Sequence, residues 1–223
     1  MNIDTPDEQP RRARRRLLLN AMAGLLAAGW AARPAAQPAP ATRAGPPTQA
    51  PPKQHFPFGP VEPVRPVPAL KVTTHEGRVT SLPKVLRGRV TAAQTMFTGC
   101  SAICPIQGAL FAQTQQALAA KGLDVQLLSI SIDPLGDTPK ALARWLEQFG
   151  RQPGWLAVAP QLDDVGRLSV LLGNGGERIV SSADVHSGQV FIFNARGELA
   201  FRTPTMPSVP QILSAAEHVS RAA

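Results

Sequence analysis

The sequence contains no tyrosine, and only two of its 223 residues are cysteine. Two cysteines can form at most one disulfide, which excludes a small secreted scaffold held together by several bridges. No uninterrupted apolar run reaches the roughly 20 residues that a bilayer-spanning helix needs. No internal repeat is present that would indicate a solenoid or a propeller. What remains is an ordinary globular domain with additional segments before it.

Residues 1–36 have the composition of an export signal. A basic cluster ending in Arg15 and Arg16 precedes the apolar stretch Leu17–Ala32, and small residues follow. This arrangement is typical of a secretory signal, so we expect residues 1–36 to direct export. The Arg15-Arg16 pair also fits a twin-arginine signal, and an uncleaved N-terminal anchor is a third option. No cysteine lies near the apolar stretch, which excludes a lipid-modified cysteine.

Residues 37–68 are rich in proline and alanine and have no hydrophobic period. Such a segment cannot bury enough apolar surface to fold, and its prolines keep it extended. We therefore expect residues 37–68 to be a disordered spacer. Residues 69–223 are enough for one well-formed core and are expected to form one domain.

The net charge of +8 does not indicate a nucleic-acid-binding protein. Six arginines and only three acidic residues lie in residues 1–36, so part of the excess belongs to the export signal. The remaining positive charge is dispersed, without a basic helix face or interleaved aromatic residues. Contact with a membrane is expected only through an N-terminal anchor.

Hydrophobic periodicity and turn residues predict the order of strands and helices in the domain. Strands are predicted over residues 71–74, 78–81, 89–97, 125–132, 190–194 and 198–202. Helices are predicted over residues 106–120, 138–149, 161–172 and 208–221. This order predicts an α/β domain with a mixed sheet covered on both faces.

The two cysteines lie between a predicted strand and a predicted helix. Cys100 and Cys104 are separated by three residues, and Pro105 follows. A helix N-terminus lowers the pKa of a thiol and favours the thiolate. The thiolate is both the nucleophile of disulfide exchange and a soft ligand for Cu(I) or Zn(II). A redox dithiol, a metal site and a structural disulfide all fit, although so short a loop gains little from a structural disulfide.

Several stretches around the cysteines form a wider pattern. It comprises Phe97–Cys100, Cys104-Pro105, Ser131–Pro139, His186–Gly188 and Asn194–Gly197. Over residues 66–215 this order resembles the SCO/SenC family of copper-chaperone and thiol-redox proteins. The resemblance implies a thioredoxin-like fold, with a central mixed sheet, helices on both faces and an N-terminal hairpin.

The resemblance also implies a copper site. Family members bind one copper ion through the two cysteines and a downstream histidine, which correspond here to Cys100, Cys104 and His186. They help to assemble the dinuclear copper centre of cytochrome c oxidase subunit II. The implied function is a periplasmic copper-binding assembly factor for this subunit or another periplasmic cuproprotein, with a thioredoxin-like protein as a candidate reductant.

His186 has the most suitable surroundings of the four histidines. We expect His55, in the spacer, and His75, in a turn, to be solvated, and His218 to lie on the surface of the last helix. His186 precedes a predicted strand, where a thioredoxin-like fold brings a loop beside the redox helix. Two thiolates and an imidazole suit Cu(I). Cu(II) with a further ligand is an alternative, and Zn(II) would normally require a fourth ligand.

Other residues near the pattern have simpler interpretations. Asp184 is a candidate to orient the imidazole or to act as a fourth ligand. Met96 and Met206 are copper ligands in principle, but Met96 ends an apolar strand and is expected in the core, and neither belongs to a methionine-rich tract. Asp133 and Asp137 are explained by a turn and by a helix start.

The chain also departs from the family pattern. Ser101 and Ala102 stand where the family commonly has proline and an acidic residue, and Val185 separates the acidic residue from the histidine. A thiol-disulfide oxidoreductase without a primary copper role is the alternative function. In that case Cys100 attacks the substrate and Cys104 resolves the mixed disulfide. A thiol peroxidase is disfavoured because the residues before Cys100 lack that class's active-site pattern.

Overall fold

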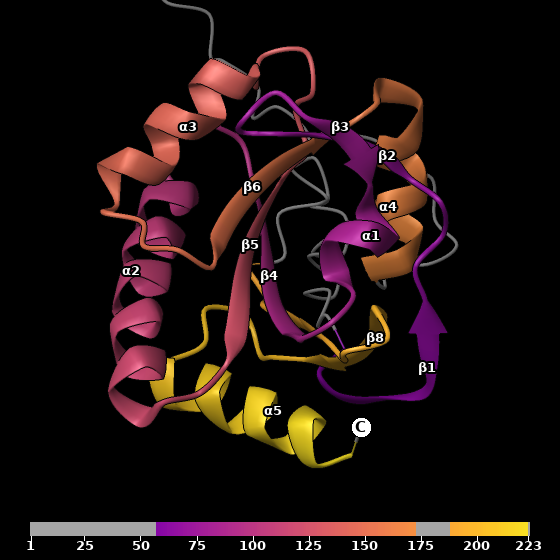
Figure 1. The fold of residues 1–223 in the computed structure, drawn as a ribbon, viewed down its shortest axis with the longest axis vertical. Coiled ribbons are helices and arrows are strands. Elements are labelled where there is room, and N and C mark those ends of the chain that lie inside the picture. Colours follow the sequence, from indigo (N-terminus) through magenta and orange to yellow (C-terminus); the bar gives the residue numbers. More distant parts are fainter. Residues whose placement is uncertain (1–56, 173–187, 223) are drawn as a thin grey trace, which may run out of the picture. The chain divides into compact units, whose positions relative to one another are not determined.

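The computed structural model of the chain describes residues 57–172 and 188–222. Within these ranges eight strands form one mixed sheet, and helices pack on both of its faces (Figure 1). The strands are β1 (Gly59–Pro66), β2 (Lys71–Thr74), β3 (Val79–Ser81), β4 (Val90–Met96), β5 (Val125–Ser131), β6 (Trp155–Pro160), β7 (Phe191–Phe193) and β8 (Glu198–Arg202). The helices are α1 (Leu82–Leu86), α2 (Ile103–Lys121), α3 (Pro139–Gln148), α4 (Val165–Leu172) and α5 (Val209–Arg221), with a short 3-10 helix (Leu162–Asp164) before α4.

The strand order brings four chain segments to one end of the sheet. The order is β1-β8-β7-β4-β5-β6-β2-β3. β4 is parallel to β5 and antiparallel to β7, and β7 is antiparallel to β8. The last residues of β4, β5 and β8 therefore lie at the same end of the sheet as the first residues of β7. We call this the carboxyl end of the sheet; the four segments there that concern the cysteine pair are 97–102, 132–138, 188–190 and 203–208.

The two faces of the sheet have separate hydrophobic cores. Helices α2, α3 and α5 cover one face, and α1 and α4 cover the other (Figure 1). On the first face Trp155 of β6 lies 5.8 Å from Phe111 of α2 and 5.9 Å from Trp145 of α3, measured between ring centroids. Gly108 leaves room for the Phe149 ring, since a Cβ at Gly108 would collide with it. This aromatic packing fixes α2, and with it the cysteine segment, against the sheet.

Most of the predicted elements are confirmed, with ends that differ by a few residues. The difference with the largest consequence is the start of α2 at Ile103 rather than Ile106, which places Cys104 inside the helix. β6 and α1 have no predicted counterpart, because β6 is rich in alanine and α1 has five residues, one of them proline. Of the helices in the described ranges, none is long and apolar enough to cross a membrane.

Strand β1 corrects the predicted boundary of the spacer. It falls within residues 37–68, which we expected to be disordered, yet it pairs with β8. Its three prolines fit because β1 is the outermost strand, one side of which needs no hydrogen-bonding partner. Val61 is buried, with 5% of its surface exposed, and anchors the strand. The folded part therefore begins before residue 69, and residues 37–56 lie outside the described part.

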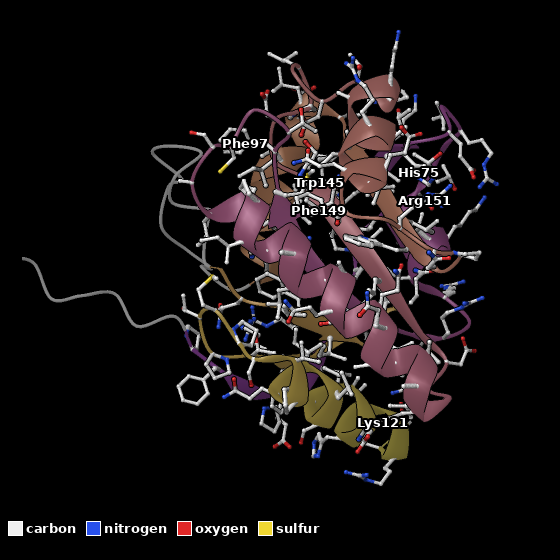
Figure 2. All side chains as sticks on the ribbon, turned by 90° about the vertical axis from the view of Figure 1, so that its left-hand side faces the viewer. His75, Phe97, Lys121, Trp145, Phe149 and Arg151 are labelled. Atoms are coloured by element: carbon white, nitrogen blue, oxygen red, sulfur yellow. The ribbon has the colours of Figure 1, made fainter. Side chains whose placement is uncertain are left out.

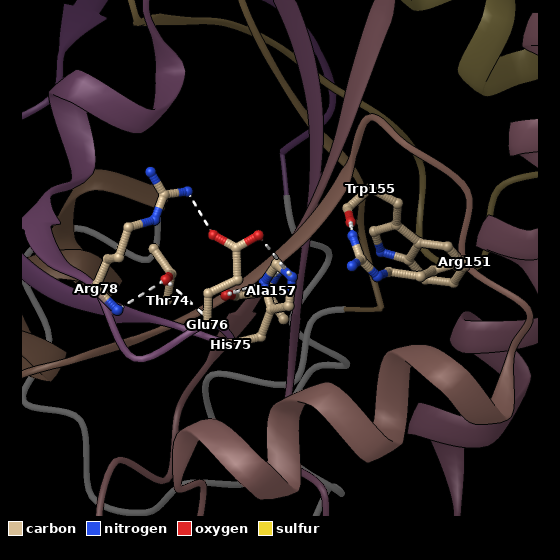
Figure 3. Close-up of polar contacts among 7 residues, drawn as sticks. All are labelled: Thr74, His75, Glu76, Arg78, Arg151, Trp155 and Ala157. Carbon is tan, nitrogen blue, oxygen red and sulfur yellow. Dashed lines mark hydrogen bonds and ion pairs between the residues drawn. The ribbon is translucent and has the colours of Figure 1, made fainter.

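His75 is a second correction, because it is buried rather than solvated, with 7% of its surface exposed. Its backbone N–H donates to the carbonyl oxygen of Ala157 at 2.9 Å, which continues the β2–β6 pairing past β2 and holds the ring against the sheet. Its Nδ1 is 3.4 Å from the same oxygen, and its Nε2 is 3.9 Å from Oε1 of Glu76 (Figure 3). Burial lowers the pKa of His75, and the positive charge of Arg151 lowers it further.

The lowered pKa of His75 predicts a loss of stability in mild acid. The unfolded chain takes up a proton near the ordinary histidine pKa of 6.5, whereas the folded chain resists protonation at His75 until the pH is lower. The free energy of unfolding should therefore fall as the pH drops below 6.5. Urea titrations at several pH values should show this slope in the wild type and in His218→Gln, and a shallower slope in His75→Gln. Equal slopes in His75→Gln and the wild type would contradict the prediction.

Candidate metal centre

Cys100 and Cys104 lie at the carboxyl end of the sheet, where β4 leads into α2. Cys100 closes the turn after β4, since its backbone N–H donates to the carbonyl oxygen of Phe97 at 3.1 Å. Cys104 is the second residue of α2 and is fully buried, whereas Cys100 is partly exposed. Figure 2 shows Phe97 near the start of α2 and Lys121 at its far end, with His75 on the other side of the view. The cysteines are therefore remote from the buried histidine.

The sulfur of Cys100 occupies the position of a helix cap. Ala102 is the N-cap residue of α2 and has no side chain to accept a hydrogen bond from the first turn. The backbone N–H groups of Cys104, Ala102 and Ile103 donate to Cys100 instead. Burial raises the pKa of Cys100, but hydrogen bonds from the Cys104 thiol and from these N–H groups outweigh it. The pKa of Cys100 is consequently lower than that of an ordinary thiol, as expected for a thiol at a helix start.

Cys104 differs from Cys100 in its protonation. Burial raises the pKa of Cys104 to about 12, and the hydrogen bond to Cys100 and the negative charge of Asp137 act in the same direction. The Cys104 thiol is thus the donor in the sulfur–sulfur hydrogen bond, and the Cys100 thiolate is the acceptor. The expectation that the helix start favours a thiolate holds for Cys100 and is wrong for Cys104, because burial outweighs it there.

The carboxylate of Asp137 holds the loop that precedes Cys100. Its Oδ1 accepts hydrogen bonds from the backbone N–H and the hydroxyl of Thr98, at 2.9 and 2.6 Å. Its Oδ2 accepts a hydrogen bond from the hydroxyl of Ser131 at 2.6 Å. The interpretation of Asp137 as part of a helix start is therefore incomplete, because Thr138 caps α3 and Asp137 links the segment after β5 to the cysteine loop.

The segment before β7 also reaches the cysteine-bearing helix, and the segment after β8 is hydrogen-bonded to that segment. A Cβ at Gly188 would lie 3.3 Å from Cδ1 of Ile103 and 3.4 Å from Sδ of Met206. The backbone N–H of Met206 donates to the carbonyl oxygen of Gly188 at 2.9 Å. Ile103 immediately precedes Cys104, so the segment before β7 lies against the first turn of α2.

Two of the three predicted copper ligands are brought together in the structure. Cys100 and Cys104 are in hydrogen-bond contact, whereas His186 and Asp184 lie outside the described residues. Gly188, two positions after His186, lies against the start of α2. In the described part of the chain no group of three or more His, Cys, Asp and Glu residues is arranged to hold a metal ion. The assignment of His186 as the third ligand stays a prediction.

Three other interpretations of single residues are confirmed. Met96 is fully buried at the end of β4, as expected for a core residue. His218 is on the exposed side of α5, with its ring 5.8 Å from that of Phe201. Asp133 stabilises a turn, in which its Oδ1 accepts a hydrogen bond from the backbone N–H of Gly136 at 3.1 Å.

The donor set of this site suits two kinds of chemistry. Two sulfur atoms, of which one is accessible, match the preference of Cu(I) for soft ligands. The same two thiols can lose two electrons and two protons to form a disulfide, because they are already in contact. In both reactions the metal ion or the disulfide substrate reaches Cys100 first, since Cys104 is buried.

Comparison with known proteins gives one curated relative. The SCO1 protein homolog of Bacillus subtilis strain 168 is 36% identical over 74 residues, which are 33% of this chain. The matching segment spans 38% of the relative's length.

Solved structures share the fold over most of their length. A SCO1/SenC family lipoprotein from Bacillus anthracis has a TM-score of 0.62 and 22% identity, over 72% of this chain and 97% of that chain. Copper-bound yeast Sco1 has a TM-score of 0.56 and 20% identity, over 69% and 92%. BsSco, described as a member of the Sco family of cytochrome c oxidase assembly proteins, has a TM-score of 0.59 and 20% identity, over 75% and 98%.

These similarities confirm the thioredoxin-like fold that the sequence implied, since the matching structures are Sco proteins. The SCO1/SenC family model matches residues 67–219, which covers the whole sheet except β1 and reaches into α5. The chain belongs to the SCO1/SenC family.

Proposed function

We propose that this protein is an exported copper-binding assembly factor that uses Cys100, Cys104 and His186 to hold one copper ion. Its target would be the dinuclear copper site of cytochrome c oxidase subunit II or another periplasmic cuproprotein. The observation that carries the proposal is the contact between the two thiols. The thiols lie at the end of the sheet that the segment after His186 also reaches. The copper-bound state of yeast Sco1, which has the same fold, supports it.

Copper is the cargo in this proposal. Cys100 supplies a thiolate more readily than an ordinary thiol because its pKa is lowered. Cys104 gives up its proton when the metal binds, since thiolate rather than thiol is the ligand. His186 would add a neutral nitrogen donor. Two thiolates and one imidazole favour Cu(I), and Cu(II) would require a further ligand.

The N-terminal sequence supports an exported location. Residues 1–36 would direct export, and residues 37–56 would separate the domain from the membrane. A thioredoxin-like reductant would keep the cysteines reduced before copper binds. The Bacillus anthracis relative is a lipoprotein, but this chain has no cysteine near its apolar stretch to carry a lipid, so any tether here would be the uncleaved signal itself.

The two thiols differ in exposure and in pKa, and this difference favours a second function. Cys100 is accessible and has a lowered pKa, whereas Cys104 is buried with a raised pKa. An attacking thiolate paired with a protected resolving thiol is the arrangement that disulfide exchange requires. The protein would then reduce the cysteines of its target before the target receives copper.

Copper titration of the reduced chain, with His186→Ala and His218→Ala in parallel, tests the proposal. We expect one copper ion per wild-type chain and per His218→Ala chain, because His218 lies on the surface of α5. His186→Ala should bind copper at least about tenfold more weakly, which corresponds to roughly 1.4 kcal/mol. Both variants should reduce insulin disulfides at the wild-type rate.

The two functions predict different outcomes of this experiment. Unchanged copper affinity in His186→Ala would exclude the three-ligand site. Disulfide reduction without stoichiometric copper binding by the wild type would leave the reductase as the function.

A further inference from the structure

Gln107 is a buried glutamine of α2, three positions after Cys104, with 1% of its surface exposed. Among the residues that the structure describes, neither its Nε2 nor its Oε1 has a hydrogen-bond partner, and no other residue there has two such atoms. Gln94 of β4 is also fully buried, but its Nε2 donates to the hydroxyl of Ser129 at 3.2 Å. A buried polar group without a partner destabilises the folded chain, so the amide of Gln107 requires an explanation other than packing.

Helix geometry directs the Gln107 side chain toward Cys104. The buried residues of α2 form one stripe along the helix, namely Cys104, Gln107, Gly108, Phe111, Thr114 and Leu118. Positions three apart in a helix are neighbours, with Cβ atoms about 5–6 Å apart. Long side chains in a helix point back toward its N-terminus, over the residues three and four positions earlier. The Gln107 side chain therefore extends along the buried stripe toward Cys104.

The amide of Gln107 can turn its donor toward the sulfur of Cys104. No hydrogen bond within the described part of the chain fixes the orientation of this amide, and the terminal torsion of a glutamine side chain has broad minima. The Cys104 thiol donates to Cys100 and accepts from the backbone N–H of Phe97. A thiolate sulfur has further lone pairs, so a metal-bound Cys104 can accept a second hydrogen bond from Nε2.

We propose that Gln107 is a positioning residue of the copper site, whose Nε2–H group donates a hydrogen bond to the Cys104 sulfur when that sulfur binds copper. The inference rests on the proposed copper function and adds a residue to it. Cys104 is fully buried, and a negatively charged atom in such surroundings needs hydrogen-bond donors. Groups that donate to a ligand atom orient it, and their loss typically weakens metal binding roughly 10- to 100-fold. The amide thus gains in the copper-bound chain the partner that it lacks in the metal-free chain.

Gln107→Leu tests the proposal, because leucine is similar to glutamine in size but cannot donate a hydrogen bond. Gln116→Leu is the matched control, since Gln116 is exposed on the same helix. In a competition with a chromophoric Cu(I) chelator, the reduced Gln107→Leu chain should bind Cu(I) about tenfold more weakly than the wild type, and Gln116→Leu as tightly as the wild type. The metal-free Gln107→Leu chain should unfold at a temperature no lower than that of the wild type, because the substitution removes an unpaired buried amide.

NMR of the full chain with ¹⁵N-labelled glutamine detects the hydrogen bond itself. Cu(I) is diamagnetic, so the side-chain amide signals of the reduced, copper-loaded chain remain observable. The signals of Gln107 are those that disappear in Gln107→Leu. On Cu(I) binding, one Nε2 proton of Gln107 should move downfield and exchange more slowly with solvent, whereas the signals of Gln116 should not change.

The outcomes separate this proposal from the function on which it rests. Equal Cu(I) affinity in the wild type and Gln107→Leu would overturn the role of Gln107 alone, and so would Gln107 signals that do not move on Cu(I) binding. A Gln107→Leu chain that loses both copper affinity and thermal stability would assign Gln107 a structural role instead. Wild-type protein that binds no Cu(I) would overturn both the copper function and the role of Gln107.

Discussion

At pH 7, iodoacetamide should modify Cys100 at least about 100-fold faster than Cys104 in the reduced chain. Only the thiolate reacts, and with a pKa of about 12 the thiolate fraction of Cys104 at pH 7 is on the order of 10⁻⁵. Cys100 has a lowered pKa and is partly exposed, so it forms a thiolate more readily than an ordinary thiol and is accessible to the reagent. Peptide mass spectrometry after timed quenching measures the two rates. Equal labelling of both cysteines would contradict the assignment of Cys100 as the reactive thiolate and Cys104 as the protonated thiol.

Two substitutions at Cys104 test the cause of this selectivity. Cys104→Ser keeps a side-chain donor next to Cys100, whereas Cys104→Ala removes it. Because the hydrogen bond from Cys104 lowers the pKa of Cys100, Cys104→Ala should slow the alkylation of Cys100 at pH 7, and Cys104→Ser should have a smaller effect. If both variants react at the wild-type rate, the helix N–H groups alone lower the pKa of Cys100.

The family pattern and the hydrophobic periodicity predicted most of the fold, because strands and helices with one buried face have a period that the sequence displays. The exceptions depend on tertiary context. β1 contains three prolines, and it forms a strand only because it pairs with β8 along one side. His75 follows β2 in a short turn, and its burial depends on the pairing with Ala157, 82 positions later in the sequence.

The cysteine pair was predictable from its spacing and from its position before a helix, and the topology explains why other parts of the site were not. Asp137 reaches Thr98, 39 positions earlier in the sequence, because β4 and β5 are adjacent and parallel. The raised pKa of Cys104 depends on burial, which the spacing of the cysteines does not reveal. The contact between Met206 and Gly188 likewise requires the β7–β8 pairing to bring the two segments together.

Asp137→Ala should lower the free energy of unfolding by about 3 kcal/mol, and Asp137→Asn by about 1 kcal/mol. The alanine variant leaves three donors without their acceptor, namely the N–H and hydroxyl of Thr98 and the hydroxyl of Ser131. An asparagine keeps one oxygen for Thr98, and the Ser131 hydroxyl can rotate to accept from its amide. Urea titration measures both losses. Equal losses in the two variants would show that the charge of Asp137, rather than its hydrogen bonds, stabilises the loop.

The same pair of variants separates the structural role of Asp137 from its electrostatic effect on the thiols. The negative charge of Asp137 raises the pKa of Cys104, so Asp137→Asn should lower that pKa and speed the alkylation of Cys104 at pH 8. Asp133→Asn is the matched control, because Asp133 lies in the same segment after β5 but binds the N–H of Gly136. It should leave the alkylation of Cys104 unchanged. Faster reaction in both variants would indicate loosening of the whole segment. Faster reaction in Asp137→Asn alone would show that the charge of Asp137 adds to burial and to the hydrogen bond with Cys100 in raising the pKa of Cys104.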